Sequence, residues 1–132
     1  MYNDYKCPKC HGQLRLGDNI ILSAIRDDKS RAIILLHPEL GNYSADYHPA
    51  TKFEEGDRVI FLCPICHHDL SSTKHKNLAM VIMTGEPGKE YDIYFSQVAG
   101  EHSTIKMMGE HVELYGTHSE KYLDFFNMSQ MH

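Results

Sequence analysis

The chain has 132 residues, of which 42% are hydrophobic and 23% are charged, and these values fit a single globular domain. Its longest apolar run covers only residues 78–83, so the sequence excludes a membrane-spanning helix. The net charge of −5 arises in residues 78–132, which hold three Lys against eight Asp or Glu. The chain therefore lacks the overall basic character that general nucleic-acid binding requires.

The first segments of the chain predict a cysteine-containing turn followed by a hairpin. Residues 5–16 form the turn and the strand that leaves it, with Leu14 and Leu16 expected on one face. The segments 19–25 and 31–36 are dominated by β-branched and aliphatic residues, and a polar turn separates them. We therefore expect two antiparallel strands here.

A continuous apolar run and a long irregular stretch come next. Residues 32–36 are all apolar, which predicts a strand that is buried on both faces. Residues 37–57 contain two prolines and two glycines, so they predict a loop that is either functional or mobile, and its aromatic residues indicate that it packs down. Residues 58–62 predict the strand that delivers a second cysteine-containing turn.

The last part of the chain predicts an antiparallel meander. Turn glycines separate short segments in which apolar and polar residues alternate, and the strands expected from them cover residues 78–83, 91–96, 103–108 and 110–115. Residues 119–128 predict a short helix, because Ser119 can act as its N-cap and Tyr122, Phe125 and Phe126 have helical spacing.

Four cysteines occur in two matched pairs. The sequences C-P-K-C at residues 7–10 and C-P-I-C at residues 63–66 are each followed by His and then Leu in the same pattern, C-P-x-C-H-x-x-L, with 52 residues between the pairs. A C-x-x-C turn can offer two sulfurs to one tetrahedral ion, and two such turns complete the closed shell of a structural zinc site. The predicted ligands of one Zn²⁺ are Cys7, Cys10, Cys63 and Cys66.

Other interpretations of the cysteines remain open at this point. Iron fits the same four-sulfur shell, and redox dithiols use the same C-x-x-C turn, although usually at the start of a helix in a βαβ unit. Unliganded buried cysteines would not account for a duplicated eight-residue pattern. Gly12 is expected to supply the backbone freedom needed after the first turn, and His68 occupies the equivalent position after the second.

The two cysteine turns resemble the paired knuckles of zinc-ribbon and rubredoxin-like domains, over about ten residues at each turn. That resemblance implies two knuckle hairpins that clamp one metal beside an antiparallel sheet, although His11 and His67 stand where glycine is usual. The expected fold class is mainly β, with this clamp, a meander and a short C-terminal helix. We expect a zinc-clamped region over residues 1–77 and an acidic meander with the helix over 78–132, together in one compact domain.

The ten histidines include a second candidate metal site. His102, His111 and His118 each follow a Gly-x-His pattern, and three converging imidazoles could hold a catalytic zinc with an open fourth position. The simpler interpretation is that glycines mark turns, and successive turns of a meander alternate between opposite edges of the sheet. His37 and His48, with Asp46, form a weaker candidate of the same kind.

No catalytic signature appears in the sequence, because G-x-S-x-G, H-E-x-x-H, P-loop and dinucleotide-binding glycine patterns are all missing. A closed four-cysteine site stabilises a fold and does not activate water. We therefore expect a non-catalytic binding or adaptor module rather than an enzyme. The alternatives are a nucleic-acid-binding protein and a metal-dependent enzyme that uses the Gly-x-His residues.

The expected partners are another protein or a second copy of the chain, and no membrane. Nucleic acid is possible at the knuckle end, where the cations are Lys6, Lys9, Arg15, Lys74 and Lys76. The first residues contain no apolar segment typical of a signal peptide, so the expected location is the cytoplasm, where thiols stay reduced and metal ligation is favoured over disulfides.

Overall fold

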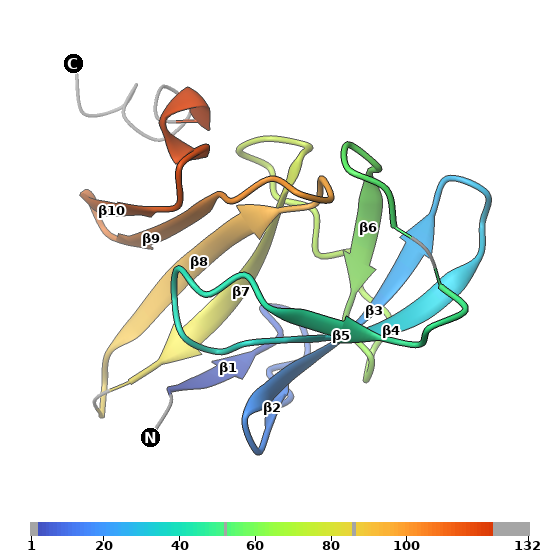
Figure 1. Cartoon of the computed structure of the whole chain (residues 1–132). Coiled ribbons are helices and arrows are strands. Elements are labelled where there is room, and N and C mark those ends of the chain that lie inside the picture. Colours follow the sequence, from blue (N-terminus) through green and yellow to red (C-terminus); the bar gives the residue numbers. More distant parts are fainter. Residues whose placement is uncertain (1–2, 52, 86, 123–132) are drawn as a thin grey trace.

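The computed structural model describes residues 3–51, 53–85 and 87–122, and these residues form ten strands and one short 3₁₀ turn (Figure 1). The chain is mainly β and its strand pairs are antiparallel, as expected. The described residues contain no helix with the length and apolar character needed to cross a bilayer.

The first sheet contains the predicted meander. Its spatial order is β1-β7-β8-β9-β10, and the strands are β1 (Asp4–Lys6), β7 (Leu78–Thr84), β8 (Glu90–Ser96), β9 (Thr104–Met108) and β10 (His111–Tyr115). Consecutive strands pair, so the four predicted segments are confirmed within one or two residues at each end. The sequence did not predict β1, a three-residue strand whose Tyr5 lies opposite Met83.

The second sheet contains the predicted hairpin. Its strands are β2 (Arg15–Leu16), β3 (Asn19–Arg26), β4 (Arg31–Leu36) and β5 (Ala45–Tyr47), in that spatial order, and β6 (Val59–Leu62) also pairs with β3. The hairpin prediction is confirmed, with Ser23 opposite Ile33. β5 lies inside the stretch expected to be irregular and pairs with β4, so the pairing partner rather than local sequence defines it.

Leu14 and Leu16, which were expected on one face, differ in exposure, and the prediction that β4 is buried on both faces is wrong. Leu14 is only 2% exposed, whereas Leu16 is 72% exposed because it sits at the tip of the β2–β3 turn. In β4 only Ile34 is buried, and Ile33 is 53% exposed on the opposite face. The apolar run of β4 therefore has one face in the core and one face open.

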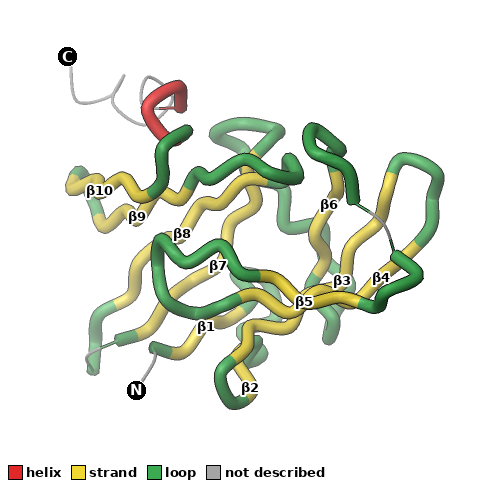
Figure 2. Tube along the Cα trace, viewed as in Figure 1, coloured by secondary structure: helices red, strands yellow, loops and turns green. Residues whose placement is uncertain are grey.

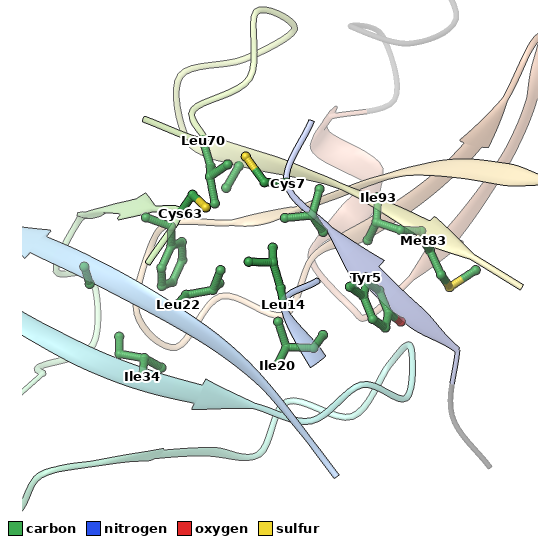
Figure 3. Packing of buried hydrophobic residues seen from close by; sticks show 14 of the residues in the cluster. Tyr5, Cys7, Leu14, Ile20, Leu22, Ile34, Cys63, Leu70, Met83 and Ile93 are labelled. Atoms are coloured by element: carbon green, nitrogen blue, oxygen red, sulfur yellow. The ribbon is translucent and has the colours of Figure 1, made fainter. Parts of the chain in front are cut away.

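The two sheets pack on each other through one hydrophobic cluster. It draws Tyr5, Val81, Met83 and Ile93 from the first sheet and Ile20, Leu22, Ile34 and Phe61 from the second (Figure 3). The expected boundary at residue 77 lies where the chain passes from β6 in the second sheet to β7 in the first. The first sheet also contains β1, from before this boundary, and the cluster draws on both sheets, so the residues on the two sides share one core.

A 3₁₀ turn, Ser119–Tyr122, stands where the C-terminal helix was expected to begin. Ser119 does not cap it in the expected way: its Oγ accepts a hydrogen bond from the Thr104 N–H at 3.1 Å and donates one to the Tyr115 carbonyl. Tyr122 is 2% exposed and packs with Leu78, Tyr94 and Ile105 in a second, smaller cluster. The predicted helix beyond residue 122 lies outside the described residues.

Gln97 is a buried polar residue that links β6 to the segment after β8. Its Oε1 accepts a hydrogen bond from the Phe61 N–H at 2.8 Å, and its Nε2 donates to Ser71 Oγ at 3.0 Å. Its main-chain carbonyl accepts from the Val59 N–H at 2.9 Å. The side chain is 1% exposed, so water cannot replace these bonds readily.

We predict that Gln97→Ala lowers the free energy of unfolding by about 2–3 kcal/mol, because the buried Phe61 N–H loses its acceptor. Urea denaturation of the metal-loaded protein measures the change. Gln13→Ala is the control, because Gln13 is exposed and its truncation should stay within about 0.5 kcal/mol. Equal effects of the two substitutions would contradict the role given to Gln97.

Candidate metal centre and binding cleft

The two cysteine pairs converge on one point, where their four sulfurs lie within 4.8 Å of one another. The Sγ atoms of Cys7 and Cys66 are 3.8 Å apart, and those of Cys10 and Cys63 are also 3.8 Å apart. A tetrahedron of sulfurs about 2.3 Å from a central ion has edges of about 3.8 Å, so these separations fit a four-thiolate metal shell. The cysteines are therefore positioned to bind a metal ion.

Each sheet supplies one knuckle, and the two knuckles have the same backbone bonds. Cys7 follows β1 of the first sheet and Cys63 follows β6 of the second, and their side chains meet beside Leu70 at one end of the core (Figure 3). In the first knuckle, the Cys7 N–H donates to the Gly12 carbonyl at 3.1 Å. In the second, the Cys63 N–H donates to the His68 carbonyl at 3.0 Å.

Backbone N–H groups point at the first sulfur of each pair. The N–H groups of Lys9 and Cys10 donate to Cys7 Sγ at 3.3 and 3.5 Å. Those of Ile65 and Cys66 donate to Cys63 Sγ at 3.3 and 3.4 Å. Such donors favour a negatively charged sulfur, so each turn is arranged for a thiolate before any ion binds.

The pKa values of the thiols indicate which sulfurs are protonated when no metal is bound. In the absence of a metal, burial raises the pKa of Cys7 above its ordinary value and that of Cys63 to about 12. The backbone N–H of His68 lowers the pKa of the exposed Cys66 to about 7. Since metal ligands must be deprotonated, a divalent ion would replace protons on the two buried sulfurs.

The left-handed residues of the knuckles are His11 and His67, with φ of 61° and 65°. The expectation that Gly12 and His68 supply this freedom is wrong by one residue. Gly12 has another role: a Cβ there would lie 2.5 Å from Cδ1 of Ile65, because the second knuckle leans over the first at this point. The knuckles thus place a non-glycine residue in the left-handed conformation at the same position of each turn.

The three Gly-x-His residues do not form a metal site. His102 and His118 lie at one end of the β9–β10 pair, with ring centroids 5.9 Å apart, whereas His111 lies at the other end of the pair, opposite Met108. Nδ1 of His118 accepts a hydrogen bond from the His102 N–H at 2.9 Å and is therefore occupied. Among the described residues, only the four cysteines group with metal-binding geometry.

The weaker candidate in the long loop does not assemble either. Nδ1 of His37 accepts from the Glu39 N–H at 3.1 Å, and Nδ1 of His48 accepts from the Ala50 N–H at 3.0 Å. Each imidazole therefore stabilises its own turn, in the manner of an Asx turn. The described His37, His48 and Asp46 do not group around a common point.

Two of the five cations at the knuckle end are already paired. Lys6 Nζ lies 2.5 Å from Glu90 Oε2, and Arg15 Nη2 lies 2.9 Å from Asp4 Oδ1. Each pair is partly exposed and adds little stability. Their effect is to reduce the positive potential around the knuckles.

A cleft opens between the two sheets, and Phe61 of β6 and Tyr5 of β1 are among the residues that line it. It has two adjoining parts of about 240 and 420 Å³, which share Leu36, Phe61, Ser96 and Gly100 in their walls. The floor is apolar and includes Ile20, Val81, Ile93 and Phe95. Figure 2 shows the loop between β4 and β5 crossing in front of β7 and β8, and residues 37–44 of this loop line the cleft.

Tyr43 fastens this loop to the first sheet. Its hydroxyl forms a 2.9 Å hydrogen bond with Thr104 Oγ1 and donates to the Tyr115 carbonyl at 3.1 Å. Its ring stacks on His102 with centroids 4.5 Å apart. The expectation that aromatic residues pack the loop down therefore holds for Tyr43.

Glu101 is the most buried carboxylate at the rim of the cleft, and its hydrogen-bonding capacity is filled. It accepts hydrogen bonds from Ser96 Oγ at 2.9 Å, from Lys121 Nζ at 2.5 Å and from the Tyr122 hydroxyl. Burial raises its pKa, but these donors outweigh burial and hold the pKa below its ordinary value. Glu101 is thus an ionised anchor for the C-terminal turn and is not poised to transfer protons.

Comparison of the chain with protein-family models, with curated proteins and with solved structures finds no match.

The knuckle strain predicts that His11→Gly and His67→Gly each raise the free energy of unfolding by about 0.5–1 kcal/mol. The left-handed conformation costs an L-residue about 1–2 kcal/mol, and glycine removes this cost. Glycine also adds an entropy cost of folding of about 0.5–1 kcal/mol, which offsets part of the gain. Thermal denaturation of metal-loaded protein measures the effect. His68→Gly is the control, because His68 is not left-handed and should only lose stability; equal shifts at all three positions would count against strain.

Proposed function

We propose that Cys7, Cys10, Cys63 and Cys66 hold one structural Zn²⁺. The sulfur separations of 3.8 Å support this, as does the absence of an open position in a shell of four protein ligands. Iron would fit the same sulfurs, and redox cysteines would not need the second pair. In this role the ion fastens β1 of one sheet to β6 of the other.

This proposal predicts that replacing any one of the four cysteines by Ser removes the metal and strongly lowers the thermal stability, because metal binding energy is folding energy in such sites. Metal analysis should give one zinc per chain in the parent and none in Cys63→Ser. If the purified protein is red and contains iron, the metal held by the four cysteines is iron and not zinc. A cysteine variant that melts with the parent would remove the structural role altogether.

We further propose that the chain is a non-catalytic binding module whose ligand site is the cleft between the sheets. The observation that carries this is a cleft of about 420 Å³ adjoining one of about 240 Å³, both with mainly apolar walls. Ligand sites typically measure about 300–1,000 Å³, whereas well-packed interiors hold few voids larger than a water molecule. The filled carboxylate of Glu101 and the separated histidines give no support to catalysis.

The rim of the cleft indicates the chemistry of its ligand. The described lining residues include the exposed Glu39 and Glu55 but no Lys or Arg, while the charge of Glu101 is balanced by Lys121. Anions would therefore be disfavoured, and a neutral or cationic small molecule with an apolar body would be accepted. The nucleic-acid alternative has less support, because ion pairs occupy Lys6 and Arg15 and the phosphate backbone needs free cations.

The cleft can be tested with the neutral fluorophore N-phenyl-1-naphthylamine, which should bind with increased emission, whereas an anionic naphthalene sulfonate should bind more weakly. Leu36 points inward and lines both parts of the cleft, so Leu36→Trp should fill it and weaken binding at least about tenfold. Leu16→Trp is the matched control, because Leu16 is 72% exposed and lies outside the cleft. Unchanged binding in Leu36→Trp would place the probe elsewhere.

A further inference from the structure

The second sheet carries apolar side chains on the face that turns away from the core. Along β3, the buried Ile20, Leu22 and Ala24 face inward, so the alternate residues face outward. The strand register places Leu35 opposite Ile21, and Ile60 opposite Ile25. These residues and Ile33 form an outer stripe across three strands: Ile21, Ile25, Ile33, Leu35 and Ile60.

The outer stripe is only partly covered by the described part of the chain: four of its residues are half-buried, and Leu62, which shares this face opposite Ser23, is buried. None of its five residues belongs to the two hydrophobic clusters or to the half-buried residues packed against them. Ile33 of β4, the strand between β3 and β5, is 53% exposed. A sheet with one face in water normally alternates apolar and polar residues, and β3 and β4 do not.

Charged residues border the outer stripe at its two ends. Arg31 lies opposite Ile25 at one end, and Asp46 lies opposite Leu35 at the other, both on the outer face. Both are exposed, and neither forms an ion pair with another described residue. The face is thus apolar along its length, positive at one end and negative at the other.

We propose that the outer stripe is the interface of a homodimer, in which a second copy of the chain packs sheet against sheet around a two-fold axis. The axis lies between the outer faces of the two copies and runs perpendicular to the strands. The strands of the second copy therefore point in the opposite direction. Arg31 then comes to the end of the stripe that carries the partner's Asp46, and the reverse pair forms by symmetry. The axis passes near Ile33, midway between Arg31 and Leu35 and the most exposed residue of the stripe.

The size of the face indicates how tightly such a dimer would bind. The face is three strands wide, at about 4.8 Å per strand, and eight residues long, at about 3.4 Å per residue. Its projected area is therefore about 400 Å². Specific interfaces typically bury about 800 Å² on each partner, and the accessible area of side chains exceeds their projection. The dimer therefore belongs to the small, reversible class, with an expected dissociation constant in the micromolar range.

Sedimentation of the zinc-loaded protein over roughly 1–500 µM tests the proposal. The parent should change from monomer to dimer with concentration, and it should reach no higher state because a two-fold interface closes. Ile33→Glu should raise the dissociation constant at least about 50-fold, since it puts two carboxylates near the axis. Met108→Glu is the matched control, because Met108 is 43% exposed in the first sheet and should leave dimerisation unchanged.

A charge exchange tests the arrangement of the two copies. Arg31→Glu alone and Asp46→Arg alone should each weaken the dimer several-fold, because each puts like charges at both ends of the interface. The double variant should recover most of the parent affinity.

A parent that stays monomeric over the whole range, or a dimer that Ile33→Glu does not weaken, would overturn the proposal. A dimer weakened by Ile33→Glu but not recovered by the double variant would overturn the two-fold arrangement. The inference is independent of the proposed ligand cleft, which lies on the inner face of the same sheet.

Discussion

The meeting of four sulfurs is the constraint on which the rest of the structure depends. β1 is a three-residue strand at the edge of one sheet and β6 is a four-residue strand at the edge of the other, so each has few ladder hydrogen bonds of its own. The knuckles bring their ends together, so an ion held by the four cysteines would fix both strands and close a loop of 52 residues between the cysteine pairs. Gln97 holds the other end of β6, and β6 therefore links the sheets at two points.

This constraint explains which features the sequence could predict. The metal centre was predictable because its chemistry is local: each C-P-x-C turn carries two ligands, and the duplicated pattern indicates that both serve one site. The long strands β3, β4, β7 and β8 were predictable from composition. β1 and β5 were not, because a three-residue strand such as Asp4–Lys6 has no periodicity and exists only where β7 offers it a partner.

The remaining differences arise from contacts that sequence spacing does not encode. A glycine at position 12 suggested the left-handed residue, but His11 adopts that conformation and Gly12 instead makes room for Ile65, a residue 53 positions away. The Gly-x-His spacing suggested convergence, but the turns of a meander alternate, and His111 lies at the opposite end of the β9–β10 pair from His102 and His118. The cleft draws its walls from both sheets, and its only local signal was the Pro- and Gly-rich segment of residues 37–57.

The wrong burial prediction for β4 is the most informative of these differences. The run of residues 32–36 has the composition of a strand covered on both faces, yet among the described residues only the face that carries Ile34 packs in the core, and Ile33 on the other face is exposed. Exposed β-branched side chains in the middle of a sheet favour association, and a protein that keeps them uses them or risks aggregation. On the dimer proposal, β6 places Phe61 in the core, Ile60 in the interface and Cys63 at the metal. Metal binding, folding and self-association would then be thermodynamically linked through one four-residue strand, since whatever stabilises β6 stabilises all three.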